Sequence, residues 1–200
     1  AMDKYGMNGM NQYDYNRAKA LQSVALQLEK ACIGGLYYEN GLIRQMRGMR
    51  SYIQTNVDDA AGSVLTKDMF NNMAQGIFRT GGFKGATNYV IMVPANQKVA
   101  VSAIDESKIQ LQRDESVRGQ VVTRILTDFG EFPVVLNDNL QSDELFFVDL
   151  NRVSIRPVNG REFFHKYLGD KGDYVHGQIV GEYTLEFQQE KAHGRIKGLK

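Results

Sequence analysis

The sequence has little of what cross-linked, secreted or membrane-spanning proteins require. Its single cysteine, Cys32, excludes an internal disulfide and is typical of a reducing compartment. No apolar run approaches the roughly 18 residues of a membrane span, and the Tyr-, Asn- and Met-rich start lacks the apolar core of a secretory signal. Neither sign of charge is in excess, with 24 basic and 23 acidic residues, so the composition does not indicate a nucleic-acid binder or a polybasic membrane protein.

Apolar residues make up 42% of the 200 residues, which is enough for the core of one or two domains. Ala1 before Met2 is not a native start, and we expect a cloning residue at the head of a fragment. The chain contains no internal repeat and no low-complexity tract.

The longest regular pattern is the alternation GQIVGEYTLEFQQE at 177–190, which predicts a strand with one buried face. At about 3.3 Å per residue this strand would span more than about 40 Å. A helix is expected over 13–32, roughly 30 Å long at about 1.5 Å per residue, and Gly34-Gly35 would end it. Its apolar stripe consists of Leu21, Val24, Ala25, Leu28 and Cys32. We expect Leu21, Val24 and Leu28 to pack on the apolar row of that strand, which is Tyr183, Leu185 and Phe187. Both termini would then build one domain, with the middle of the chain inserted into it.

The middle of the chain mixes helix and strand patterns and predicts an α+β fold. Helices are expected over 64–82, with Thr66 as N-cap, and over 95–104. Strands are expected at 88–94, 144–150 and 153–156, together with a hairpin of 120–127 and 131–136 around Asp128-Phe129-Gly130. Pro133 suggests an edge position or a bulge in that hairpin. The remaining segments are expected to be short strands or irregular (36–62), a mobile charged loop (105–120), a short helix or turn (161–168) and a break (169–173).

No set of residues assembles a catalytic, cofactor or metal site. Asp128-Phe129-Gly130 matches the metal-binding triplet of protein kinases, but Gln112 and Gly119 stand where the kinase motif needs His and Asn. The GGFKG segment at 81–85 lacks the GK[ST] ending of a phosphate-binding loop. Cys32 on the apolar stripe predicts a buried, inert thiol, and the three histidines are too far apart in sequence to suggest a zinc site. An enzyme domain with an unrecognised site stays open as an alternative.

Landmarks over most of the chain resemble those of a known family. They are TGG at 80–82, YVIMVP at 89–94, TDFGEFPVVLN at 127–137, LFFVDL at 145–150, and a tail with a Gly-Asp turn, a glutamate-flanked aromatic strand and Ala192-His193-Gly194. In this order and spacing the chain resembles a major capsid (head) protein of tailed bacteriophages, in the podophage-like branch. The resemblance implies the Hong Kong 97-type capsid fold, with a long spine helix, long peripheral β strands and an inserted axial domain.

Mapped onto this sequence, the resemblance makes 13–32 the spine helix and 177–190 a peripheral strand. The peripheral domain would comprise 1–59 and 161–200, and the axial domain 60–160. The family's N-terminal arm and extended loop have no counterpart before the helix. We therefore expect this 200-residue chain to be a monomer or small oligomer that does not close a shell.

The resemblance implies a structural protein of a phage or prophage that assembles with itself, as pentamers and hexamers, into an icosahedral shell. Double-stranded DNA would be enclosed cargo, and scaffold, portal or decoration proteins would be further partners, without a membrane or a cofactor. The protein would be part of the virion and would be made in the cytoplasm of the host bacterium. The candidates for subunit contacts are charged: Arg44, Arg47, Arg50, Arg113, Asp114 and Arg118. The first three recur every third residue, which predicts a row facing solvent or a partner. A bacterial compartment shell of the encapsulin type is the alternative within structural proteins.

Overall fold

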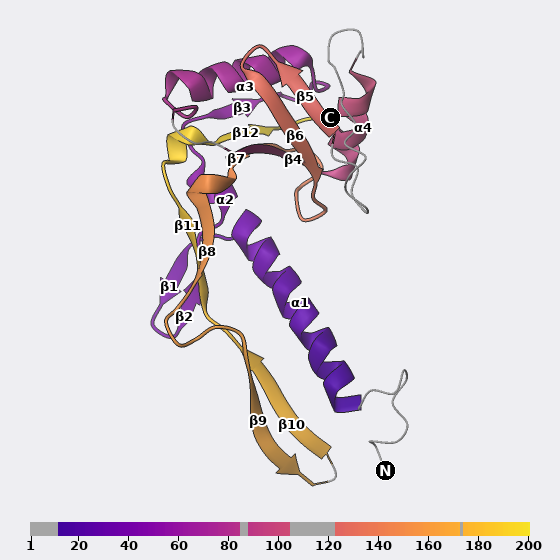
Figure 1. Cartoon of the computed structure of the whole chain (residues 1–200), viewed down its shortest axis with the longest axis vertical. Helices are drawn as coiled ribbons and strands as arrows, with labels where there is room; N and C mark the ends of the chain where they lie inside the picture. Colours follow the sequence, from indigo (N-terminus) through magenta and orange to yellow (C-terminus); the bar gives the residue numbers. More distant parts are fainter. Residues whose placement is uncertain (1–11, 85–87, 105–122, 173) are drawn as a thin grey trace.

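A mixed six-stranded sheet lies in the upper part of the molecule (Figure 1). The computed structural model describes residues 12–84, 88–104, 123–172 and 174–200. The strand order is β3 (Val57–Asp59), β12 (Gly194–Lys197), β7 (Leu145–Asp149), β4 (Tyr89–Val93), β6 (Gly130–Leu136) and β5 (Thr123–Thr127). The pairs β3–β12 and β4–β6 are parallel, and the other neighbours are antiparallel.

Strand β7 is apolar along most of its length because it is buried on both faces. Successive side chains of a strand point to opposite faces, so this one strand contributes to two cores. The first core lies under α3 (Lys67–Arg79) and includes Phe70, Met73, Ile77, Leu145 and Phe147. The second core lies under the C-terminal end of α1 (Gln12–Gly34) and α2 (Met49–Tyr52) and includes Cys32, Ile33, Met49, Phe146, Val148 and Leu185.

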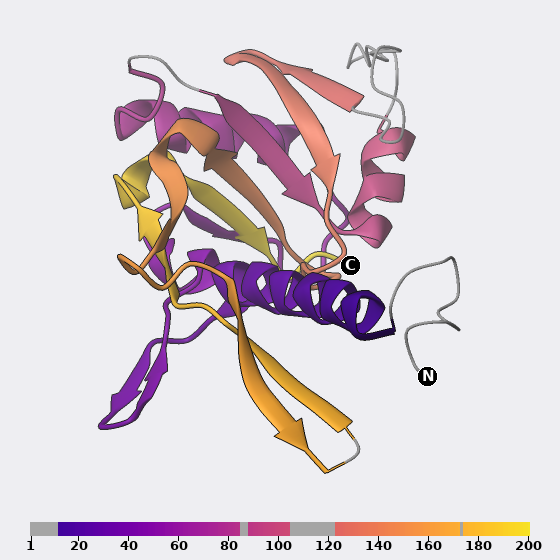
Figure 2. The same cartoon turned by 60° about the horizontal axis from the view of Figure 1, so that its bottom comes forward.

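Helix α1 and three two-stranded antiparallel ribbons extend away from the sheet (Figures 1 and 2). The ribbons are β1 (Tyr38–Asn40) with β2 (Ile43–Gln45), β8 (Val153–Pro157) with β11 (Tyr183–Phe187), and β9 (Phe164–Lys171) with β10 (Tyr174–Val180). Two short 3-10 helices, Leu150–Arg152 and Glu190–Ala192, precede β8 and β12. Within the described ranges none of the three ribbons has a third strand.

Most local predictions are confirmed. The helices expected at 13–32, 64–82 and 95–104 are α1, α3 and α4 (Ala95–Ala103), and Thr66 is the N-cap residue of α3 although its side chain makes no capping hydrogen bond. The strands expected at 88–94, 144–150 and 153–156 are β4, β7 and β8, and Asp128 lies in the turn of the β5–β6 hairpin. Segment 105–120 lies outside the described residues, apart from the strand that begins at 123.

The single long strand at 177–190 is wrong. The chain pairs with β9 as far as Val180 and with β8 from Tyr183 onward. Gly181 permits the change of partner, because a Cβ there would lie 2.5 Å from the Phe163 ring. The alternation is real on each side of this glycine, but sequence alone does not show that the two halves have different partners.

Two smaller expectations are also wrong. The segment at 161–168 is neither helix nor turn, because its second half begins β9 and pairs with β10, a contact that local sequence does not encode. Pro133 is not on an edge strand, since β6 lies between β4 and β5. Pairing of β6 with β4 is recorded from Val134 onward, so Pro133 lies just before that register.

The burial expected along α1 is confirmed only at its C-terminal end. Cys32 is buried, and Leu28 packs against the second core that contains Leu185. Leu21 is 44% exposed, because no long strand covers this part of the helix. The division into 1–59 with 161–200 and 60–160 stays a prediction, and β3 and β12 from the first of these parts lie in the six-stranded sheet.

Candidate functional site

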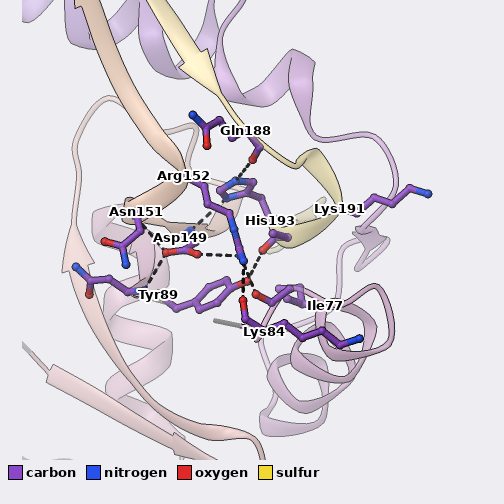
Figure 3. A network of polar contacts seen from close by, with 12 residues as sticks. Ile77, Lys84, Tyr89, Asp149, Asn151, Arg152, Gln188, Lys191 and His193 are labelled. Carbon is purple, nitrogen blue, oxygen red and sulfur yellow. Dashed lines mark hydrogen bonds and ion pairs between the residues drawn. The ribbon is translucent and has the colours of Figure 1, made fainter. Parts of the chain in front are cut away.

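A buried carboxylate ends strand β7. Asp149 Oδ1 accepts hydrogen bonds from the backbone N–H of Asn88 at 2.9 Å and of Asn151 at 3.1 Å. Its Oδ2 lies 2.9 Å from Arg152 Nη1, and Arg152 also donates to the carbonyl oxygens of Gly82 at 2.7 Å and Lys84 at 3.0 Å. The carboxylate and guanidinium therefore connect the end of β7 to the segment after α3 (Figure 3).

His193 is buried beside this ion pair in a defined tautomer. Its Nδ1 accepts from the backbone N–H of Asp149 at 3.2 Å, and its Nε2 lies 3.2 Å from the carbonyl oxygen of Gln188. The neutral ring with hydrogen on Nε2 satisfies both contacts. Burial lowers the pKa of His193, which lies against the Phe187 ring with 4.2 Å between centroids.

The other residues of the tail motif have packing roles. The Tyr89 hydroxyl donates to the carbonyl oxygen of Ala192 at 2.7 Å, and burial raises the pKa of Tyr89 to about 12. A Cβ on Gly194 would come within 2.4 Å of Met73 Sδ. The segment Ala192-His193-Gly194 thus connects the sheet to β11 through close contacts.

This polar network stabilises the fold and offers no reactive group to solvent. Asp149, Arg152 and His193 turn toward one another (Figure 3), and backbone groups take up the contacts described above. In the part of the chain that the structure describes, no His, Cys, Asp and Glu cluster is arranged to hold a metal ion. The helices of that part are too short or too polar to span a membrane. The sequence analysis did not identify this network; its only signal was an aspartate at the end of an apolar strand.

A second buried carboxylate precedes β7. Glu144 is fully buried and pairs with Arg195, whose Nη2 and Nε lie 2.9 and 3.0 Å from Oε2. Arg50 Nε lies 3.1 Å from Oε1, and its Nη2 also contacts this atom. The expectation that Arg50 faces solvent or a partner is therefore wrong for its guanidinium. The three-residue period is not carried on one element, because Arg44 lies in β2, Arg47 lies between elements and Arg50 lies in α2.

The other candidate contact residues are not brought into one cluster. Arg44 is exposed and lies 3.7 Å from Glu39. Arg47 donates to the carbonyl oxygen of Ser51 at 2.6 Å and lies over the Tyr52 ring at 4.8 Å. The other three candidates, Arg113, Asp114 and Arg118, lie outside the described residues. Subunit contacts of this set stay a prediction.

Cys32, the one cysteine, is buried as expected. Burial raises the pKa of its thiol, and the nearby charge of Glu29 adds to the effect. The thiolate that reacts with disulfides or metals is therefore disfavoured.

An open groove of about 1310 Å³ runs beside α1, and we call it the α1 groove. One wall is the helix face that carries Val24, Leu28 and Ala31, and the opposite wall includes Tyr183 and Thr184 of β11. Val24 and Tyr183, which were expected to pack together, thus line the same groove. The β1–β2 hairpin contributes a further wall.

A family model described as the SU10 major capsid protein matches residues 1–200. The chain belongs to the SU10 major capsid protein family. The predicted family and function are thereby confirmed: this is a structural capsid protein, a component of a virion whose shell is assembled from multiple copies. Among curated proteins, none matches the sequence.

Solved structures of capsid proteins share the fold of this capsid protein at low sequence identity. The SrpI encapsulin of Synechococcus elongatus has a TM-score of 0.67 and 11% identity, over 100% of this chain and 70% of that chain. The capsid of cyanophage A-1(L) has a TM-score of 0.66 and 9% identity, over 96% and 72% of the two chains. A putative capsid protein of an E. coli prophage has a TM-score of 0.62 and 12% identity, over 98% and 72%. The predicted Hong Kong 97-type fold is confirmed by these likenesses.

Proposed function

We propose that this capsid protein assembles into the closed icosahedral head of a tailed phage or prophage, as pentamers and hexamers around double-stranded DNA. The observation that carries the proposal is the family match over residues 1–200. Helix α1 and three open ribbons support it, because isolated two-stranded ribbons are marginally stable in water and gain stability from neighbours. The protein is made in the cytoplasm of the host bacterium, where scaffold, portal and decoration proteins are further partners.

The test is expression of the protein followed by gradient sedimentation and negative-stain microscopy. We expect closed particles of uniform size, and nuclease treatment of particles from infected or induced cells leaves their enclosed DNA intact. A protein that stays monomeric at high concentration, with and without its phage neighbours, would count against the proposal.

A bacterial compartment shell is the second candidate, favoured by the likeness to the SrpI encapsulin over 100% of this chain. The contents of purified particles discriminate the two. Protected double-stranded DNA supports a phage head, whereas a stoichiometric enzyme cargo without DNA supports a compartment.

The proposed role is mechanical and does not include catalysis. Asp128, the one residue of a kinase-like triplet that would bind a metal, accepts a hydrogen bond from Asn71 at 3.1 Å in the β5–β6 turn. We expect no thermal shift on addition of magnesium and ATP. A shift that disappears in Asp128→Ala would contradict this part of the proposal.

A further inference from the structure

The β1–β2 hairpin exposes more apolar surface than so small an element normally does. All six residues of its two strands are exposed. Leu42 at the turn is 103% exposed, and Ile43 beside it is 58% exposed. Leu36, Tyr37 and Tyr38 extend the exposed surface at the base of the hairpin. Contiguous exposed apolar side chains of this kind mark interaction sites.

The α1 groove is a complementary feature of the same subunit. It is lined in large part by apolar side chains, among them Val24, Leu28 and Phe163. Its volume of about 1310 Å³ exceeds the roughly 300–1,000 Å³ of most small-molecule pockets, and it is open to solvent. It therefore suits a segment of protein chain better than a metabolite.

A subunit cannot fill this groove with its own hairpin. Gly41, Leu42 and Arg44 already form part of the groove wall, so the hairpin tip is fixed at the rim. The turn is short, since Asn40 pairs directly with Ile43 and Gly41 adopts a φ of +58° that favours glycine. The occupant must come from another molecule, and in a shell built from identical copies the neighbouring subunit is the most abundant one.

We infer that the β1–β2 hairpin of one copy docks in the α1 groove of a second copy, with Leu42 entering the groove. The inference rests on the proposed shell function and names one of its contacts. The contact joins two different patches, so it is head-to-tail, and such contacts generate rings when the rotation closes. Leu42 provides the apolar anchor that the centre of an interface needs, and Arg44 with Glu39 lies at its polar rim.

Disulfide trapping between separately purified variants tests the contact. Leu42→Cys protein is mixed with Thr184→Cys protein at high concentration and oxidised, because Thr184 is exposed on the groove wall. The native Cys32 is buried and stays in all samples. The control replaces Leu42→Cys with Leu126→Cys, a 43% exposed leucine on β5 at the edge of the six-stranded sheet. We expect a heterodimer at least five-fold more abundant in the test mixture than in the control.

The two proposals fail in different ways. Equal cross-linking in test and control mixtures overturns the docking inference, whether or not particles form. Cross-linking without closed particles supports docking and counts against the shell proposal. A second variant, Leu42→Ser, is expected to reduce oligomers at least ten-fold in light scattering, while Leu126→Ser leaves them unchanged; equal behaviour of the two variants overturns docking.

Discussion

Removal of the Glu144 carboxylate is the sharpest test of how the two halves of this protein are joined. Glu144 is fully buried between Arg50 of α2 and Arg195 of β12, with side-chain exposures of 24% and 17% for the two arginines. Deleting one partner of a buried ion pair costs about 3–5 kcal/mol, because the remaining charge stays buried without compensation. Both arginines keep some contact with water, so we expect about 3 kcal/mol for Glu144→Ala, near the lower end. For a chain of this length, about 2–4 °C per kcal/mol gives a decrease in Tm of about 6–12 °C.

The assay is urea and thermal unfolding followed by circular dichroism, with Glu182→Ala as the matched control. Glu182 forms an equally direct ion pair with Arg161 at 2.7 Å, but the two side chains are 49% and 51% exposed. Exposed pairs contribute about 0–1 kcal/mol, so the control should lose less than about 1 kcal/mol. Equal losses in the two variants would refute the reasoning that burial decides the magnitude.

Three further predictions use stability as the readout. Because the pKa of buried His193 is lowered from its ordinary value of 6.5, the unfolded state binds a proton first as pH falls. The stability contributed by the neutral ring is therefore complete above about pH 6.5 and decreases below it, by at most about 1.4 kcal/mol per pH unit; urea midpoints from pH 8 to 5 should show this decrease, and His193→Asn should weaken it. Gly48→Ala should cost about 1–3 kcal/mol by overpacking, since its Cβ would lie 2.5 Å from the backbone nitrogen of Gly35, whereas Gly34→Ala, whose nearest atom is 3.5 Å away, should cost less in the same unfolding assay. Leu28→Ala should cost only about 1–2 kcal/mol, because Leu28 is partly buried, and Leu21→Ala should cost less than about 0.5 kcal/mol; equal large losses would show that α1 is covered in solution.

The stabilising polar sites were beyond the reach of sequence reasoning. Glu144 and Asp149 flank an apolar strand, and such carboxylates are usually exposed loop residues. Their partners Arg50, Arg195 and Arg152 lie 94, 51 and 3 positions away. Only the last of these separations is local enough to be suspected from the sequence. The residues chosen as subunit contacts were selected by their spacing, and Arg50 shows that spacing does not define a face when three arginines lie on different elements.

The sequence by itself determined the local elements and the family. Apolar periodicity placed α1, α3, β4 and β7, because each element must direct one or both faces toward a core, and the order of landmarks indicated the capsid family. Only the tertiary structure decided which strands pair, where the chain at Gly181 changes partner, and which faces remain uncovered. Pairing depends on contacts between segments far apart in the chain, and a periodic pattern states that a face is apolar without stating what covers it. For α1 that face borders an open groove in the single subunit, and its apolar residues have the chemistry that a neighbouring copy can bury.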